Sequence, residues 1–236
     1  MSPRIHPTAI VDKKAEIAKD AEIGPFVIVG PGCVVGPGCV LEPRATLQEN
    51  VRLGSEVTVG SGSILGGKPQ DLKFRGEVTR VEIGDHTVIR EYVTINRGTS
   101  QSFKTTVGAH CFLMSYSHLA HDCHVGDNVI MSNATQLAGH VTIEEYVIIS
   151  GVCAVHQFVK AVGNPIQLYG LNSVGLRRRG FSDEVIAELK KAYRLLFRSE
   201  FNVSQALEQA ATELKPYDEV KALIEFVEAS SRGVTV

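Results

Sequence analysis

Residues 5–35 read IHPTAIVDKKAEIAKDAEIGPFVIVGPGCVV, and an aliphatic side chain returns at every sixth position. The aliphatic positions in this stretch are Ile5, Val11, Ile17, Ile23, Val29 and Val35. A helix repeats every 3.6 residues and a strand every second residue, so neither produces this spacing. A short strand followed by a tight turn does, and three such units close a triangular coil of 18 residues. Stacked coils form a solenoid with strands about 4.8 Å apart.

The same six-residue period returns twice later in the chain. It resumes at Ile83 and again at Val107, and it continues to Val155. We therefore expect an all-β solenoid, a parallel β-helix of hexapeptide repeats, over residues 1–160. Two segments interrupt the period, residues 65–82 and 101–106, and we expect them to leave the wall as loops. Loops on a rigid scaffold often carry function.

The second inward position of each six-residue unit holds a small side chain, and all five cysteines share this phase. They are Cys33, Cys39, Cys111, Cys123 and Cys153. Free cysteine packs as a small buried apolar residue. We therefore interpret the cysteines as core residues and not as metal ligands or disulfides.

The pattern changes beyond the solenoid. We expect a connecting segment over residues 161–181 and a small C-terminal α-helical domain over residues 182–236. Residues 182–198, SDEVIAELKKAYRLLFR, place apolar side chains on one helical face, with Ser182 as the N-cap. Further helices are expected on either side of Pro216, because proline interrupts a helix.

Composition narrows the function classes. The formal net charge of −2 gives no reason to expect a nucleic-acid partner. No apolar run approaches the roughly 20 residues of a membrane span, and the start MSPRIHPTAI lacks the apolar segment of a signal peptide. We expect a cytoplasmic protein without a membrane span.

Histidines concentrate near the end of the solenoid. Positions 18 apart lie above one another, so His121, Gly139 and Gln157 should form one column, with Asp122 and His140 in the next. An imidazole can take a proton from an attacking hydroxyl, and a glycine N–H can stabilise an oxyanion. Neighbouring residues on a strand point to opposite faces, so Asp122 can orient His121 only near a coil corner.

Metal binding is the rival interpretation of the same residues. His118, His121 and His140 could form a three-histidine zinc site, as in hexapeptide-repeat carbonic anhydrases. The H-x-x-H spacing on a solenoid edge is not specific, and we expect no metal. His124 is expected to be a solvated surface residue.

Seven motifs follow one another along the chain: IHPTAIV, PQDLKFRGE, VTINRGT, HLAHDCHVGD, NATQLAGHV, AVHQF and GLNSVGLRRRGF. In this order they resemble the UDP-N-acetylglucosamine O-acyltransferases that begin lipid A synthesis. The resemblance covers nearly the whole chain. It favours this family over the N-acyltransferases of the same pathway, which carry an additional N-terminal domain.

The resemblance implies a left-handed β-helix and a homotrimer with sites between neighbouring subunits. The donor would be an acyl carrier protein thioester, and the acceptor the glucosamine 3-position of UDP-GlcNAc or its 3-amino analogue. No cofactor would be needed. His121 matches the general base, Asp122 its partner carboxylate and Gly139 the oxyanion-hole glycine. The remaining matches are substrate-binding positions: Gln70, Asp71, Lys73, His118, His140, Gln157, Asn172 and Arg178.

The chain departs from the family pattern after AVHQF. The family continues with at least one more coil and a D-x-P-P turn, whereas HQFVK here runs directly into AVGNPIQLYG. Relative to the family pattern, roughly one coil plus a connecting segment is therefore expected to be missing between Lys160 and Ala161. The alternatives are another hexapeptide-repeat acyl- or acetyltransferase, and a noncatalytic trimeric scaffold, which the absent coil would favour.

Overall fold

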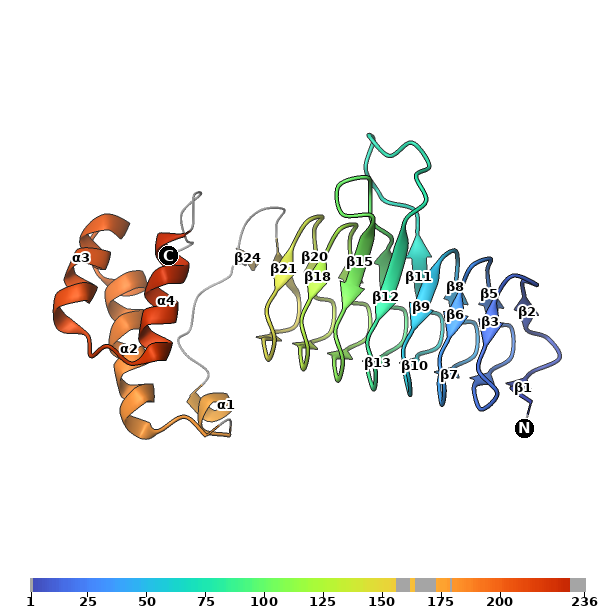
Figure 1. The fold of residues 1–236 in the computed structure, drawn as a ribbon, viewed down its shortest axis with the longest axis horizontal. Coiled ribbons are helices and arrows are strands. Elements are labelled where there is room, and N and C mark those ends of the chain that lie inside the picture. Colours follow the sequence, from blue (N-terminus) through green and yellow to red (C-terminus); the bar gives the residue numbers. More distant parts are fainter. Residues whose placement is uncertain (1, 156–161, 164–172, 179, 230–236) are drawn as a thin grey trace. The chain divides into compact units, whose positions relative to one another are not determined.

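The computed structural model describes residues 2–155, 162–163, 173–178 and 180–229. The chain divides into two compact units, residues 1–165 and 166–236. All strands belong to the first unit and all helices to the second (Figure 1). In the part of the chain that is described, no helix is long and apolar enough to cross a membrane.

Three sheets form the walls of the first unit. The first sheet contains β1 (Arg4–Ile5), β4 (Glu22–Ile23), β7 (Val40–Leu41), β10 (Thr58–Val59), β13 (Val88–Ile89), β16 (Phe112–Leu113), β19 (Ile130–Met131) and β22 (Ile148–Ile149). The second contains β2 (Ile10–Val11), β5 (Ile28–Val29), β8 (Thr46–Leu47), β11 (Ile64–Gly67), β14 (Thr94–Asn96), β17 (His118–Leu119), β20 (Gln136–Leu137), β23 (Cys153–Val155) and β24 (Val162–Gly163). The third contains β3 (Glu16–Ile17), β6 (Val34–Val35), β9 (Val51–Leu53), β12 (Arg80–Ile83), β15 (Lys104–Val107), β18 (His124–Val125) and β21 (Thr142–Ile143).

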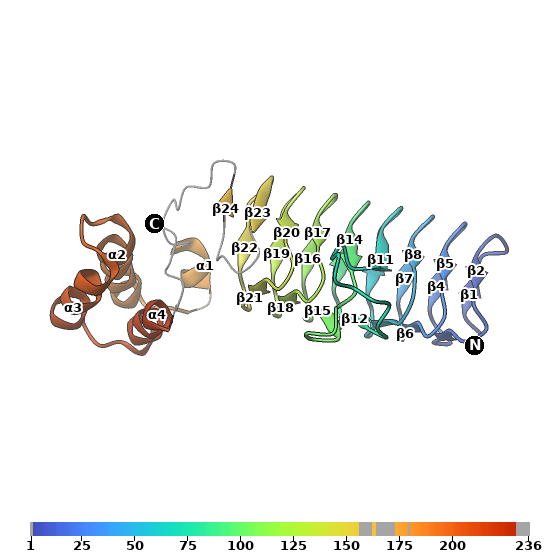
Figure 2. The ribbon, with the colours of Figure 1, turned by 90° about the horizontal axis from the view of Figure 1, so that it is seen from above.

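Successive coils pair in parallel, and Figure 2 shows their strands side by side along the solenoid. Arg4 lies opposite Glu22, which is the expected spacing of 18 residues. Only the last strand, β24, pairs antiparallel among the described strands, with β23 as its partner. The predicted left-handed parallel β-helix followed by C-terminal helices is confirmed.

The interior is a continuous stack of aliphatic side chains. Leu41, Leu47, Ile89 and Leu119 are at most 1% exposed. Cys33, Cys39, Cys111 and Cys123 are buried free thiols, as predicted, and Cys153 is half-buried. Burial raises the pKa of the first four thiols, which keeps them protonated and unreactive.

Tight turns at the corners leave little room between coils. Within the described part of the chain, fifteen residues other than glycine have a positive φ, Asp122 and His140 among them. Gly30 is required for a different reason, since a Cβ there would lie 1.5 Å from the carbonyl oxygen of Gln48 in the next coil.

Both loops leave the solenoid at the corner between the second and third sheets, called here the second–third corner. They comprise residues 68–79, between β11 and β12, and residues 97–103, between β14 and β15 (Figure 1). The bounds predicted from sequence, 65–82 and 101–106, were wrong. Strand pairing continues beyond the six-residue register, because Arg80 lies opposite Lys104 and Gly67 opposite Asn96.

The second unit contains α1 (Ser173–Arg178), α2 (Asp183–Arg198), α3 (Val203–Glu213) and α4 (Asp218–Glu228). Ser182 caps α2 by accepting a hydrogen bond from the Val185 N–H, and Asn202 forms a capping box with Gln205 at the start of α3. The short helix α1 lies inside the segment that we expected to be only a connection.

Candidate active site

The second–third corner collects residues that are far apart in the sequence. His121 and Asp122 connect β17 to β18, and Gly139 and His140 connect β20 to β21 in the next coil. Since both loops leave the same corner, residues 68–79 and 97–103 come to lie beside these turns.

His121 and Asp122 form a buried pair, each 8% exposed. Asp122 has a left-handed φ of 59°, so the chain reverses there and the carboxylate can reach the preceding side chain. His121 Nδ1 lies 2.8 Å from Asp122 Oδ2. The corner position that the sequence required for this contact is therefore observed.

Asp122 is ionised over the whole physiological range. Burial alone would raise its pKa, but hydrogen bonds from Ser102, His121 and Thr99 outweigh burial and lower the pKa to about 2. An ionised carboxylate only accepts hydrogen bonds, so His121 Nδ1 must be the donor. A neutral His121 then presents an unprotonated Nε2, the atom that a general base needs.

The neighbouring histidines lack a carboxylate partner of this kind. His118 Nδ1 lies 2.7 Å from the Thr94 hydroxyl, and His124 Nδ1 contacts the Thr106 hydroxyl. Burial lowers the pKa of His118, which favours its neutral form. Of the three histidines spaced three residues apart, His121 alone is oriented by an ionised group.

Gly139 lies against the ring of His121, as the predicted column requires. A Cβ at Gly139 would come within 2.6 Å of His121 Cε1 and 2.7 Å of Nε2. Glycine is therefore the residue that leaves this ring in place. Among the described residues, the Gly139 N–H donates to no carbonyl oxygen, in contrast to the flanking Ala138 and His140 N–H groups.

His140 completes a compact cluster. Its ring meets the His121 ring edge to face, with centroids 5.0 Å apart, and its Nδ1 lies 3.8 Å from Asp122 Oδ2. Ligand atoms of these three residues lie within 4.8 Å of one another, close enough to hold a metal ion. His118, part of the alternative zinc site considered from sequence, is not in this group, and its Nδ1 contacts the Thr94 hydroxyl instead.

The distances within the cluster favour the hydrogen bond between His121 and Asp122 over a bound metal ion. Zinc requires about 2.0 Å to each ligand atom, so an ion would have to replace the hydrogen bond between His121 and Asp122. It would also compete with the hydroxyl of Thr99, which lies 2.7 Å from the same carboxylate oxygen. The expectation of no metal remains a prediction.

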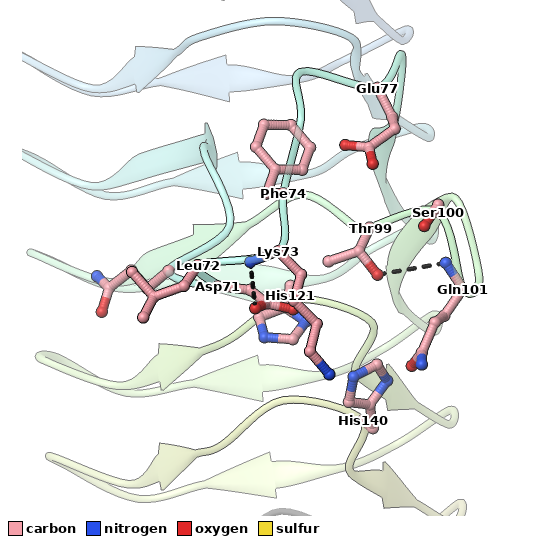
Figure 3. Close-up of a pocket in the computed structure, with 11 residues that line it drawn as sticks. Asp71, Leu72, Lys73, Phe74, Glu77, Thr99, Ser100, Gln101, His121 and His140 are labelled. Atoms are coloured by element: carbon pink, nitrogen blue, oxygen red, sulfur yellow. Dashed lines mark hydrogen bonds between the residues drawn. The ribbon is translucent and has the colours of Figure 1, made fainter.

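The longer loop covers His121 and forms a pocket of about 540 Å³ (Figure 3). Among its lining residues are five that the sequence predicted: Gln70, Asp71, Lys73, His121 and His140. In Figure 3 the amine of Lys73 extends toward His140. Leu72, Phe74, Glu77, Thr99, Ser100 and Gln101 line the remainder.

A second pocket of about 440 Å³ follows the outer face of the second sheet. It contains the predicted residues His118 and Gly139, and its walls include Ala120, Leu137 and Ala138. Gln70 and His121 line both pockets. The imidazole therefore lies where two pockets meet, and the pocket under the loop is the more polar of the two.

Arg97 anchors the longer loop, residues 68–79, and this role was not predicted from the sequence. The residue is 5% exposed, and its guanidinium lies 3.0 Å from a carboxylate oxygen of Glu49 and 5.7 Å from the ring centre of Phe74. It also donates to the carbonyl oxygen of Gly66 at 3.3 Å. Arg97 thus ties residues 68–79 to the wall through a cation–π contact.

Three predicted residues cannot be placed in the site. Gln157 and Asn172 lie outside the described residues, and so does the side chain of Arg178, whose backbone belongs to α1. The junction of Lys160 and Ala161 also lies outside them. Thr99 and Ser102, which bind Asp122, were not predicted, although Thr99 belongs to the quoted motif VTINRGT.

Three family models match successive parts of the chain. Residues 155–235 match the family model Udp N-acetylglucosamine O-acyltransferase, Domain 2. Residues 104–135 match the bacterial transferase hexapeptide model, and residues 5–100 match the GMPPB C-terminal domain.

Close relatives cover nearly the whole chain. An acyl-[acyl-carrier-protein]–UDP-N-acetylglucosamine O-acyltransferase of Stenotrophomonas maltophilia strain R551-3 is 43% identical, over 98% of this chain and 97% of its own. The chain belongs to this family. The UDP-N-acetylglucosamine O-acyltransferase structure from Moraxella catarrhalis is 40% identical, with a TM-score of 0.89 over 98% of this chain and 99% of that one. The Bacteroides fragilis enzyme structure is 35% identical, with a TM-score of 0.88 over 98% and 100%.

This family member is shorter than its relative within the aligned region. The Stenotrophomonas alignment spans 258 positions, against 236 residues in this chain, so at least 22 positions have no residue here. This number exceeds one 18-residue coil. The omission expected after AVHQF remains a prediction, because the alignment length does not locate the missing positions.

The low pKa of Asp122 predicts a pH-dependent stability. The ionised Asp122 carboxylate stabilises the folded protein at pH values above its unfolded pKa of about 3.9. This stabilisation is lost as the pH falls toward 2, and the free energy of unfolding then decreases by about 2–3 kcal/mol. We expect the stability difference between wild type and Asp122→Asn, from urea unfolding at pH 6 and pH 2.5, to shrink at low pH. The exposed Asp20, changed to Asn, serves as the control. An equal Asp122→Asn difference at both pH values would contradict the assignment.

Proposed function

We propose that this protein transfers an acyl chain from an acyl carrier protein thioester to the 3-hydroxyl of the glucosamine in UDP-GlcNAc. The observation that carries the proposal is the buried hydrogen bond between His121 Nδ1 and Asp122 Oδ2 at the junction of two pockets. Family membership supplies the substrate classes, since the relatives are named for this donor and acceptor. In the lipid A family this is the first step of the pathway.

The proposed reaction balances without a cofactor. His121 Nε2 removes the proton of the sugar hydroxyl as its oxygen bonds to the thioester carbonyl carbon. The negative charge that develops on the carbonyl oxygen is stabilised by the Gly139 N–H. The C–S bond then breaks, and the proton passes from His121 to the leaving thiolate. Asp122 stays ionised and stabilises the imidazolium between the two proton transfers.

The two pockets suit the two substrates. Lys73 and Gln70 come from the loop that forms the polar pocket, and a lysine amine suits a diphosphate. The pocket along the second sheet has more apolar walls and suits the acyl thioester. We assign Asp71, His118 and His140 to substrate contacts at this junction, and Gln157, Asn172 and Arg178 remain predicted contacts.

Exposed basic side chains on α2 suit an acidic carrier protein. Lys190, Arg194 and Arg198 are exposed on this helix. Arg177 of α1 is also exposed, although it forms an ion pair with Asp183 at 2.9 Å. Electrostatic complementarity of this kind accelerates association. We assign acyl carrier protein as the partner of this surface and the cytoplasm, where such thioesters are made, as the location.

Removal of the base should abolish turnover. We expect His121→Ala to lower kcat at least 10²-fold, measured with acyl carrier protein thioesters of varied chain length and either UDP-GlcNAc or its 3-amino analogue. His124→Ala is the matched control, because His124 lies on the next strand with a neutral partner. A strong chelator should leave the rate unchanged.

Retained turnover in His121→Ala would remove the residue from this role. Activity that depends on a metal would favour the metal interpretation of the cluster. Absence of transfer to either acceptor by the folded wild-type protein would favour the noncatalytic scaffold.

A homotrimer is part of the proposal. The outward side chains of the first sheet are mainly apolar, including Val88, Phe112, Ile130 and the 53%-exposed Ile148. The corner between the first and second sheets exposes Phe26, Val152 and a stacked tyrosine pair, Tyr92 and Tyr116. Contiguous apolar surfaces of this kind mark protein interfaces. A three-fold axis along this corner would bring each first sheet against the second sheet of a neighbour, beside the apolar pocket.

Sedimentation velocity tests the trimer. We expect a particle of about three times the 25.6 kDa chain mass, and dissociation when Ile130→Glu places a charge on the first sheet. Thr142→Glu, on the outward face of the third sheet, should leave the trimer intact. A wild-type protein that sediments as a single chain would contradict the arrangement.

A further inference from the structure

Loop 97–103 contacts the catalytic pair and not only the pocket. Four of the hydrogen bonds to the Asp122 carboxylate come from this one loop, from the backbone N–H and hydroxyl groups of Thr99 and Ser102. The Asp122 side chain is 1% exposed, so solvent cannot replace these donors easily. The loop therefore determines how the carboxylate is oriented.

Thr99 contributes two bonds of fixed direction. Its N–H donates to Asp122 Oδ1 at 2.9 Å, and its hydroxyl donates to Oδ2 at 2.7 Å. The hydroxyl oxygen accepts the N–H of Gln101 at 3.3 Å (Figure 3), which leaves its single proton for the carboxylate. Thr99 is itself 5% exposed.

Ser102 is a less directional donor. Its hydroxyl has one proton and two acceptors, the carboxylate of Asp122 and the carbonyl oxygen of Lys104, the latter at 2.7 Å. Its N–H is farther from Asp122 Oδ1, at 3.3 Å. The hydroxyl of Thr99 is the better defined constraint.

The position of Oδ2 matters because two imidazoles compete for it. His121 Nδ1 lies at 2.8 Å and His140 Nδ1 at 3.8 Å from this oxygen. A small rotation of the carboxylate would exchange one partner for the other. His121 would then lose the acceptor that keeps its proton on Nδ1 and leaves Nε2 bare.

We propose that Thr99 is a positioning residue whose hydroxyl holds Asp122 Oδ2 on His121 and so fixes the tautomer of the general base. The proposal rests on the proposed acyl transfer for its kinetic consequence. Its structural consequence, the proton location on His121, is independent of that reaction. Thr99 also lines the pocket under the longer loop, so a direct substrate contact must be distinguished from positioning.

Two substitutions separate these roles. Thr99→Val keeps the shape and the backbone N–H but removes the hydroxyl, whereas Thr99→Ser keeps the hydroxyl. We expect Thr99→Val to lower kcat at least tenfold with KM for both substrates unchanged, because it removes a hydrogen bond to a charged group. Thr99→Ser should restore kcat to within a few-fold of wild type. In an Asp122→Asn background, Thr99→Val should have little further effect.

Nitrogen-15 NMR of the His121 imidazole provides a readout without turnover. We expect the neutral ring to carry its proton on Nδ1, with Nε2 bare, in wild type and Thr99→Ser, and to be a mixture of tautomers in Thr99→Val. Circular dichroism confirms that each variant retains the solenoid.

The outcomes are distinct. Unchanged imidazole signals together with kcat within twofold of wild type in Thr99→Val would overturn the proposal. A raised KM with unchanged kcat would also overturn it, since Thr99 would then be a binding residue. If wild type transfers no acyl group but the tautomer shifts as expected, the proposed function fails and the positioning role stands.

Discussion

Each described strand of the solenoid is only two to four residues long and, except for β24, is held by parallel pairing to the strand one coil away. This constraint fixes a spacing of 18 residues wherever no loop intervenes, as between Arg4 and Glu22 or His118 and Gln136. The position of a residue along the sequence therefore determines where it lies on the surface of the solenoid. Placing Gly139 against the ring of His121 follows from it, and so does the convergence of both loops on one corner.

The coil architecture also explains why the pair of His121 and Asp122 is at a corner. On a flat strand, neighbouring side chains diverge, whereas the left-handed turn at Asp122 lets two consecutive residues share a hydrogen bond. On the flat sheets, His118 and His124 each form a hydrogen bond with a threonine hydroxyl of the preceding coil. The chemical difference among three similar histidines therefore comes from their place in the coil.

Periodic parts of the chain were predictable from sequence, and the loops were not. The six-residue register gave the core, the buried cysteines, the column of His121 and Gly139, and the corner requirement for Asp122. It misplaced the loop bounds, because the four-residue strands β12 and β15 continue to pair where the register is interrupted. Thr99, Ser102 and Arg97 act through contacts within aperiodic segments, which no spacing rule reveals. The omission after AVHQF, by contrast, was inferred because it interrupts a repeat, and it remains a prediction.

The central claim is that His121 Nε2 faces the hydroxyl that is acylated. A crystal structure of the protein with bound UDP-GlcNAc tests this most directly. We expect the 3-hydroxyl of the sugar within about 3 Å of His121 Nε2, with the diphosphate under residues 68–79. A sugar bound at another corner of the solenoid, or one that directs a different hydroxyl to His121, would contradict it.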